Sequence, residues 1–179
     1  MPRNVEIKAR VEDLEAVKQR ILALRSNAAY DVCPEPTVMR QKDSFFNLPA
    51  GKCGKLKLRQ MGLYNELIYY DREESTGPKL SSYNKCQVNE DVEKVLTNAL
   101  GTWGVVNKER SLIMVGQTRV HFDRVDGLGD FVELEVVLND SQTVEDGQSI
   151  AEDLMSHMGV EEKDLISVAY VNMLVQNKS

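Results

Sequence analysis

The sequence predicts an α+β fold in which an antiparallel β-sheet that can close into a barrel is flanked by helices. Much of the chain alternates apolar and polar residues with a period of two, which is typical of strands with two different faces. Short turn signals separate these segments, and short connections favour antiparallel hairpins over parallel crossovers. Charges of one sign are grouped along single strand faces, and this grouping favours closure of the sheet around a shared interior.

Four alternating segments carry the clearest strand signal. They are residues 5–8, 55–59, 120–123 and 132–136. Turn residues that include Gly or Pro follow or separate the strands at 48–51, 76–78, 115–117 and 126–129. We therefore expect neighbouring strands in the sequence to pair as hairpins.

Apolar residues at helical spacing predict four helices. The first covers residues 13–25 with Asp13 as its cap, and the second covers residues 92–99 and stops at Gly101. The third covers residues 150–158 before Gly159, and the fourth begins near Asp164. Their apolar faces predict one core, and the absence of repeats, linkers and low-complexity tracts predicts a single domain over residues 1–179.

Composition and charge exclude several classes of protein. The net charge of −6 argues against a general nucleic-acid coat, and no apolar run approaches the roughly 18 residues that a membrane span needs. The first residues carry charge and no apolar leader segment, so we expect a cytoplasmic protein with neither membrane nor nucleic-acid partners. Three widely spaced cysteines without a CxxC pair indicate neither a disulfide framework nor a zinc knuckle.

Basic residues concentrate in part of this acidic chain. Between residues 40 and 59, six Lys and Arg residues accompany a single acid, Asp43. Side chains at i and i+2 of a strand lie roughly 7 Å apart on one face, so like charges there disfavour a sheet unless an opposite charge faces them. A solvated outer face remains the simpler explanation for any single strand. The ordered sets are Lys55, Lys57 and Arg59; Lys108 and Arg110; Arg119, His121 and Asp123; and Glu133 and Glu135.

An inward charged face would suit a polyphosphate with a divalent metal. Guanidinium groups bind phosphate oxygens bidentately, and lysines add point charges. Glu133 and Glu135 share a face, and Glu6 and Asp123 supply further oxygens of the kind that Mg²⁺ prefers. His121 fits equally a hydrogen-bonding wall residue and a ligand. The sequence carries no Ser-His-Asp signal, Cys nucleophile or Walker loop.

Several motifs in order resemble one known family. Residues 4–8, NVEIK, resemble the ExExK opening of the CYTH superfamily of triphosphate tunnel proteins. The later segments resemble the class IV adenylyl cyclase and thiamine triphosphatase-like branch of this superfamily. Together these matches cover nearly the whole chain. These segments are QKDSFF (41–46), KLKLR (55–59), YDR (70–72), GPKLS (77–81), KER (108–110), TRVHFD (118–123) and GLGDFVELE (127–135).

The resemblance implies a tunnel of eight antiparallel strands and assigns roles to its residues. It implies catalytic roles for Glu6, Lys8, Glu133 and Glu135, and metal binding by Glu6, Asp123, Glu133 and Glu135. It implies substrate binding by Lys8, Lys57, Arg59, Arg72, Lys79, Lys108, Arg110 and Arg119. Arg72, Lys79 and Ser81 fall on an expected loop near the mouth, and Lys55 precedes the core of its motif. One departure is clear, since Asn4 stands where the family has its first glutamate, and a neutral amide cannot replace a carboxylate's charge.

We therefore expect metal-dependent hydrolysis of a small-molecule triphosphate with Mg²⁺ or Mn²⁺ as cofactor. Two alternatives stay open: a class IV-type adenylyl cyclase that makes cyclic AMP from ATP, and a binding protein without turnover because of Asn4. The sequence does not choose between tripolyphosphate, a nucleoside triphosphate and thiamine triphosphate. It also leaves open whether the protein is a monomer or a homodimer.

Overall fold

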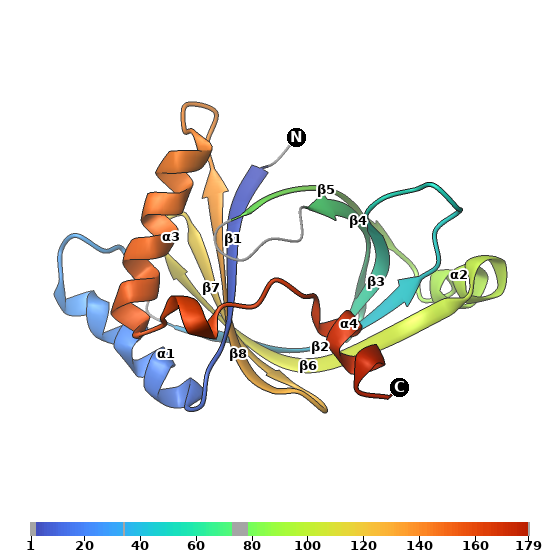
Figure 1. The fold of residues 1–179 in the computed structure, drawn as a ribbon, viewed down its shortest axis with the longest axis horizontal. Helices are drawn as coiled ribbons and strands as arrows, with labels where there is room; N and C mark the ends of the chain where they lie inside the picture. The colour runs from blue at the N-terminus through green and yellow to red at the C-terminus, as the bar shows by residue number, and fades with distance from the viewer. Residues whose placement is uncertain (1–2, 34, 73–78, 179) are drawn as a thin grey trace.

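Eight antiparallel strands form a closed barrel in a computed structural model that describes residues 3–33, 35–72 and 79–178 (Figure 1). The order around the barrel is β1-β5-β4-β3-β2-β6-β7-β8, and β8 pairs with β1 to close it. This confirms the predicted α+β antiparallel barrel. The strands are β1 (Arg3–Arg10), β2 (Thr37–Phe46), β3 (Lys55–Met61), β4 (Tyr64–Arg72), β5 (Lys79–Val88), β6 (Thr102–Val115), β7 (Thr118–Val125) and β8 (Gly129–Leu138).

Hairpins build most of this barrel, as the short connections predicted. Strands β2 to β5 pair in sequence order, and β6 to β8 do the same. Three pairings between strands distant in sequence join these sets, because β2 pairs with β6 and β1 pairs with both β5 and β8. The predicted turn at residues 76–78 lies outside the described residues.

The period-two alternation separates a charged interior from an apolar exterior. On β8, Val132, Leu134 and Val136 belong to a buried apolar cluster on the outer side of the sheet, while Glu133 and Glu135 line a cavity inside the barrel. The apolar face is covered by helices α1 (Leu14–Ala23) and α3 (Val144–Met158), which Figure 1 shows beside β1, β7 and β8. The main core therefore lies between sheet and helices, which leaves room in the bore for the charged side chains.

Three of the four predicted helices are confirmed, although α3 begins at Val144, six residues before the predicted range. Asp13 caps α1 by accepting a 2.9 Å hydrogen bond from the Ala16 amide, and α2 (Val92–Leu100) ends at Gly101 as expected. Helix α3 ends at Gly159, whose positive φ of 71° is the left-handed conformation that glycine adopts readily. In the part of the chain that the structure describes, no helix has the length and apolarity to cross a membrane.

The prediction for the fourth helix was wrong at its start. Helix α4 (Tyr170–Gln176) begins six residues after Asp164. The segment before it is extended because Leu165 forms a β-bridge with Ala9, and the Ile166 amide donates to the Lys8 carbonyl over 2.9 Å. Pairing with β1 thus overrides the helical pattern. The segment runs across the barrel towards α4 (Figure 1), and it brings Tyr170 to the cavity wall.

Candidate active site

A cavity of about 310 Å³ lies inside the barrel, and all eight strands contribute side chains to its wall. The inward face of the strands is therefore the charged face that the sequence grouped. Among the residues whose side chains are described, the basic ones in the wall are Lys8, Lys57, Arg59, Lys85, Lys108, Arg110 and Arg119. The acidic ones are Glu6, Asp43, Glu66, Glu133 and Glu135.

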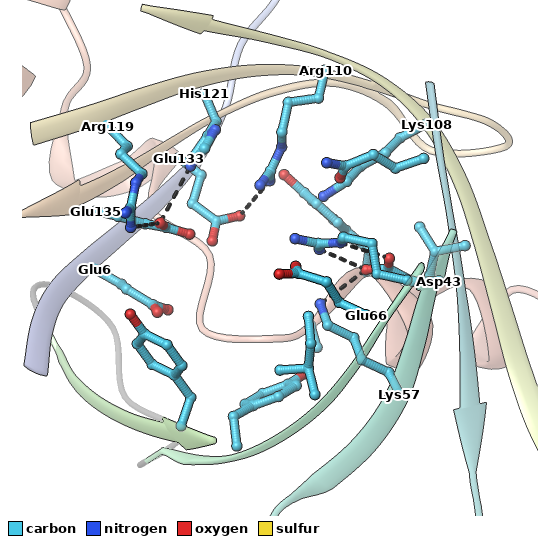
Figure 2. Close-up of a pocket in the computed structure, with 18 of the residues that line it drawn as sticks. Glu6, Asp43, Lys57, Glu66, Lys108, Arg110, Arg119, His121, Glu133 and Glu135 are labelled. Carbon is cyan, nitrogen blue, oxygen red and sulfur yellow. Dashed lines mark hydrogen bonds and ion pairs between the residues drawn. The ribbon is translucent and has the colours of Figure 1, made fainter. Parts of the chain in front are cut away.

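Asp43 organises the cations on one wall of the cavity. It lies directly opposite Arg59 across β2 and β3, and Arg59 donates from Nε to Oδ1 over 2.9 Å and from Nη2 to Oδ2 over 2.8 Å. Lys57 Nζ also donates to Oδ2 over 2.9 Å, as the dashed lines of Figure 2 show. Burial acts to raise the pKa of Asp43, but the charges of Arg59 and Lys57 outweigh it and hold this pKa well below its usual value. Asp43 is therefore an anion at neutral pH.

Asp123 organises a second set of cations in the same way. It lies opposite Arg110 across β6 and β7, and Arg110 donates from Nε and Nη2 to the two carboxylate oxygens, each over 2.6 Å. Lys108 Nζ lies 3.4 Å from Oδ2, and the Tyr170 hydroxyl donates to the same oxygen over 2.9 Å. Asp123 is fully buried and is absent from the described cavity wall. The structure thus places this predicted metal ligand behind the cations, where it holds Arg110.

These two clusters are the same structural unit used twice. Each has a Lys-X-Arg sequence on one strand, 57–59 on β3 and 108–110 on β6, and an Asp opposite the Arg on the neighbouring strand. The four strands are consecutive in the barrel, in the order β3-β2-β6-β7. A guanidinium has five N–H donors and a bidentate carboxylate takes two, so a held Arg can still donate to a phosphate. We call these clusters the Asp43 unit and the Asp123 unit.

Carboxylates on β1 and β8 form a different wall, which Figure 2 shows across the cavity from Asp43 and Lys57. Glu6 lies directly opposite Glu135 in the ladder between these strands, and Lys8 lies opposite Glu133. Glu133 Oε2 is 3.8 Å from Lys8 Nζ and 3.3 Å from Arg110 Nη2. Glu135 Oε2 is 3.5 Å from Arg119 Nη1. We call Glu6, Glu133 and Glu135 the acidic wall.

His121 is a buried neighbour of the acidic wall. Its Nε2 lies 3.3 Å from Glu135 Oε2 without hydrogen-bond geometry, and neither ring nitrogen has a hydrogen-bond partner among the described residues. Burial and then the charge of Arg110 lower the pKa of His121, although Glu135 acts to raise it. His121 is therefore neutral at pH 7 and adds little charge to the wall.

The acidic wall has the donor chemistry of a Mg²⁺ or Mn²⁺ site. Within residues 3–33, 35–72 and 79–178, no three His, Cys, Asp or Glu side chains gather closely enough to enclose a metal ion. Mg²⁺ is commonly held by one or two carboxylates, with substrate phosphates and water as its other ligands. Opposed carboxylates such as Glu6 and Glu135 fit a metal that arrives with a triphosphate.

Two expected substrate residues, Arg72 and Lys79, have undescribed side chains, as does Ser81. Arg72 ends β4 and Lys79 begins β5, so both lie on strands rather than on the expected loop. The backbone of Lys79 pairs with Glu6, and that of Ser81 pairs with both Asn4 and Arg72. The side chains of residues 72–82 lie outside the described part of the structure. Lys55 does not appear in the described cavity wall, in keeping with its place before the core of its motif.

Several wall residues escaped prediction from the sequence. Asp43 and Glu66 lie two residues from Phe45 and Ile68, which also line the cavity, so each pair shares one face of its strand. This two-residue spacing is the sequence signal from which Asp43 and Glu66 could have been predicted. Glu66 accepts hydrogen bonds from Tyr64 over 2.9 Å and from Lys85 over 3.0 Å. Tyr170 carried no such signal, because only the extended segment before α4 brings it to the wall. Two further wall residues without an assigned role are Gln41 and Tyr83.

Comparison with known proteins finds relatives over nearly the full chain. Adenylate cyclase CyaB of Aeromonas hydrophila is 25% identical over 185 residues, covering 97% of this chain and 90% of that protein. A Pyrococcus horikoshii protein has the same fold, with a TM-score of 0.78, 22% identity and coverage of 94% and 98%. A putative adenylate cyclase from Vibrio parahaemolyticus superposes with a TM-score of 0.73, 20% identity and coverage of 96% and 97%.

The family of this chain is identified by a match to the sequence model of the CYTH domain. This model matches residues 2–170, a span that contains all eight strands and reaches the first residue of α4. The resemblance drawn from the motifs is thereby confirmed. The chain belongs to the CYTH domain family.

Proposed function

We propose that this protein hydrolyses a triphosphate with the help of a divalent metal inside the barrel. The observation that carries the proposal is that the Asp43 unit lies across the cavity from the acidic wall, while Arg110 of the Asp123 unit lines the same cavity beside Glu133. Membership of the CYTH family, which binds triphosphate substrates, supports it. Inorganic and organic triphosphates share the group that such a cavity would bind.

The two units would bind the phosphate oxygens. Arg59 and Arg110 are each held by a bidentate carboxylate, so little conformational entropy is lost when they donate to phosphate. Lys57 and Lys108 add charge from the same faces of β3 and β6, and Lys8 and Arg119 add charge beside the acidic wall. Arg72 and Lys79 remain proposed phosphate ligands by family resemblance alone.

The acidic wall would hold the metal and orient the attacking water. Glu6, Glu133 and Glu135 supply the hard oxygen donors that suit Mg²⁺ or Mn²⁺. When bound, such an ion neutralises phosphate charge and polarises a P–O bond. The wall carboxylates would also accept hydrogen bonds from a water and orient it in line with a terminal phosphorus. Lys8, close to Glu133, would stabilise charge on the transferred group.

A second candidate is cyclisation of ATP, favoured by the similarity to Adenylate cyclase CyaB of Aeromonas hydrophila. In that reaction the ribose 3′-hydroxyl attacks the α-phosphorus and pyrophosphate leaves. The same cations would bind the phosphates in a different register. The products therefore separate the two candidates.

A product panel tests the proposal. Tripolyphosphate, ATP and thiamine triphosphate are incubated with Mg²⁺ or Mn²⁺, and phosphate, pyrophosphate and cyclic AMP are all quantified. We expect phosphate release that excess chelator abolishes, and at least a hundredfold loss in Glu133→Gln and Glu135→Gln at unchanged fold. Turnover that persists in chelator would refute the metal mechanism, and cyclic AMP with pyrophosphate would support the cyclase. Tight binding without any product would support a non-catalytic binding protein.

A further inference from the structure

The side-chain amide of Gln41 is a poorly satisfied polar group in the cavity wall. Gln41 lies on β2, is 5% exposed and lines the cavity. Its Nε2 donates to two thioethers, Met39 Sδ over 3.1 Å and Met61 Sδ over 3.2 Å. Its Oε1 is buried and has no hydrogen-bond partner among the residues that the structure describes. Both ends of the amide are therefore poorly satisfied.

This arrangement is costly for the protein alone. A thioether is a weak acceptor, and a buried amide oxygen without a partner costs about 1–3 kcal/mol. A half-turn of the amide would place Oε1 next to the thioethers and Nε2 where no described partner lies, so neither orientation satisfies both ends. An amide in this state is satisfied by a ligand that presents one donor and one acceptor side by side.

Gln41 lies next to the cations that would bind phosphate. It is two residues from Asp43 on the same strand face and directly opposite Lys108 in the ladder between β2 and β6. Met61 is likewise two residues from Arg59 on β3, and such neighbours lie roughly 7 Å apart. The amide is therefore at the edge of the cationic surface, where a group attached to a phosphate chain would lie.

We infer that Gln41, between Met39 and Met61, reads the base of a nucleoside triphosphate, and that the base is adenine. The inference rests on the proposed function, since it takes the cations to bind the triphosphate. A carboxamide pairs with adenine by donating to N7 and accepting from the N6 amino group. The polarisable sulfurs of Met39 and Met61 suit contact with a flat aromatic ring. Inorganic tripolyphosphate would leave this group unused.

The test compares two ligands that differ by the nucleoside. Calorimetry in excess chelator, where the proposed hydrolysis cannot consume tripolyphosphate, measures the affinity of tripolyphosphate and of the non-hydrolysable β,γ-imido analogue of ATP. Gln41→Met keeps the side-chain length and suits an apolar pocket with two methionines. We expect it to weaken binding of the ATP analogue about 5- to 150-fold, which corresponds to one bidentate base contact of about 1–3 kcal/mol. Tripolyphosphate affinity should change less than about twofold.

Gln60→Met is the matched control. Gln60, on β3, also has a buried Oε1 without a partner in the described structure, but it does not line the cavity. We expect this variant to bind both ligands as the wild type does. A loss equal to that of Gln41→Met would mean that the amide acts through the fold, and the inference would be wrong.

The remaining outcomes are also decisive. If Gln41→Met changes both ligands by the same factor, or neither, Gln41 does not read a base. If the wild type binds the corresponding GTP analogue as tightly as the ATP analogue, the base is not adenine. If Gln41→Met weakens the binding of the ATP analogue only, and the wild type binds tripolyphosphate but does not hydrolyse it in the product panel, then Gln41 reads the base and the proposed hydrolysis is wrong.

Discussion

Asp43 and Arg59 face each other across β2 and β3 and form a bidentate pair inside the barrel, with bonds of 2.9 and 2.8 Å. Their side chains are only 4% and 16% exposed, so water screens this pair weakly. A buried pair gives little net stability over an apolar substitute, but removal of one partner leaves an uncompensated charge. The pair therefore keeps Arg59, a proposed phosphate ligand, charged and oriented while no substrate is bound.

Asp43→Asn should destabilise the protein, and a bound triphosphate should restore part of the lost stability. The amide keeps the shape of the carboxylate but leaves Lys57 and Arg59 without their counter-charge, at a cost of about 3 kcal/mol. Because a bound triphosphate supplies that charge, tripolyphosphate should raise the Tm of the variant more than that of the wild type. Thermal unfolding with and without ligand measures both effects.

Asp130→Asn provides the surface control. Asp130 pairs with Arg124 over 3.2 Å, but the Arg124 side chain is 64% exposed, and an exposed pair contributes at most about 1 kcal/mol. We expect little change in Tm and no change in the ligand effect. Equal behaviour of the two Asp variants would show that Asp43 does not serve the cavity cations.

Arg59→Ala and Arg110→Ala should each weaken triphosphate binding about 10- to 150-fold, since each removes a charge-assisted contact of about 1.5–3 kcal/mol. Arg110→Ala should also lower the stability more, because it leaves the fully buried Asp123 with only Lys108 and Tyr170 among the described residues. Calorimetry and thermal unfolding separate the two effects. Arg124→Ala, on the outside of β7, is the control. Unchanged affinity in both cavity variants would make these arginines purely structural.

The affinity for triphosphate should fall as the pH rises through about 8. Burial, followed by the charge of Arg59, lowers the pKa of Lys57 to about 8, against the opposite effect of Asp43. A bound anion favours the charged lysine and raises its pKa, so the contribution of Lys57 is full below the free-state pKa and declines above it. Calorimetry in buffers of different ionisation enthalpy should detect proton uptake near this pH.

Lys57→Arg tests that assignment. A guanidinium stays charged throughout this range, so the variant should take up fewer protons at pH 8 and lose less affinity between pH 8 and 9. Lys108, whose pKa burial lowers to about 7, accounts for the part of the decline that begins at lower pH. An unchanged pH profile in Lys57→Arg would show that Lys57 does not titrate on binding.

Asn4→Glu should raise the rate of hydrolysis. Asn4 is 3% exposed, lines the cavity in the same row as Glu6 and Lys8, and has a buried Oδ1 without a partner in the described part of the chain. A carboxylate there would extend the acidic wall and strengthen the binding of the metal ion. Single-turnover rates at saturating metal report the chemical step. A slower variant at every metal concentration would show that the asparagine belongs to the native site.

The sequence by itself determined the repeating elements of this protein. The period-two alternation of β1, β3, β7 and β8 predicted strands with one charged and one apolar face, and the family motifs implied that eight strands close into a barrel. Caps and glycines predicted three helices for local reasons, as Asp13 and Gly159 illustrate. The family motifs also named the cations of both units.

Only the tertiary structure decided how those charges are partnered. The pairing of Asp43 with Arg59 depends on the register of β2 and β3, and that of Asp123 with Arg110 depends on the register of β6 and β7. Metal binding by Asp123 stays a prediction. The extended segment before α4 is fixed by its bond to the Lys8 carbonyl, and it places Tyr170 against Asp123. The single-domain span and the cytoplasmic location stay predictions. Period and spacing are local properties of a chain, whereas which charge meets which depends on contacts between residues distant in sequence.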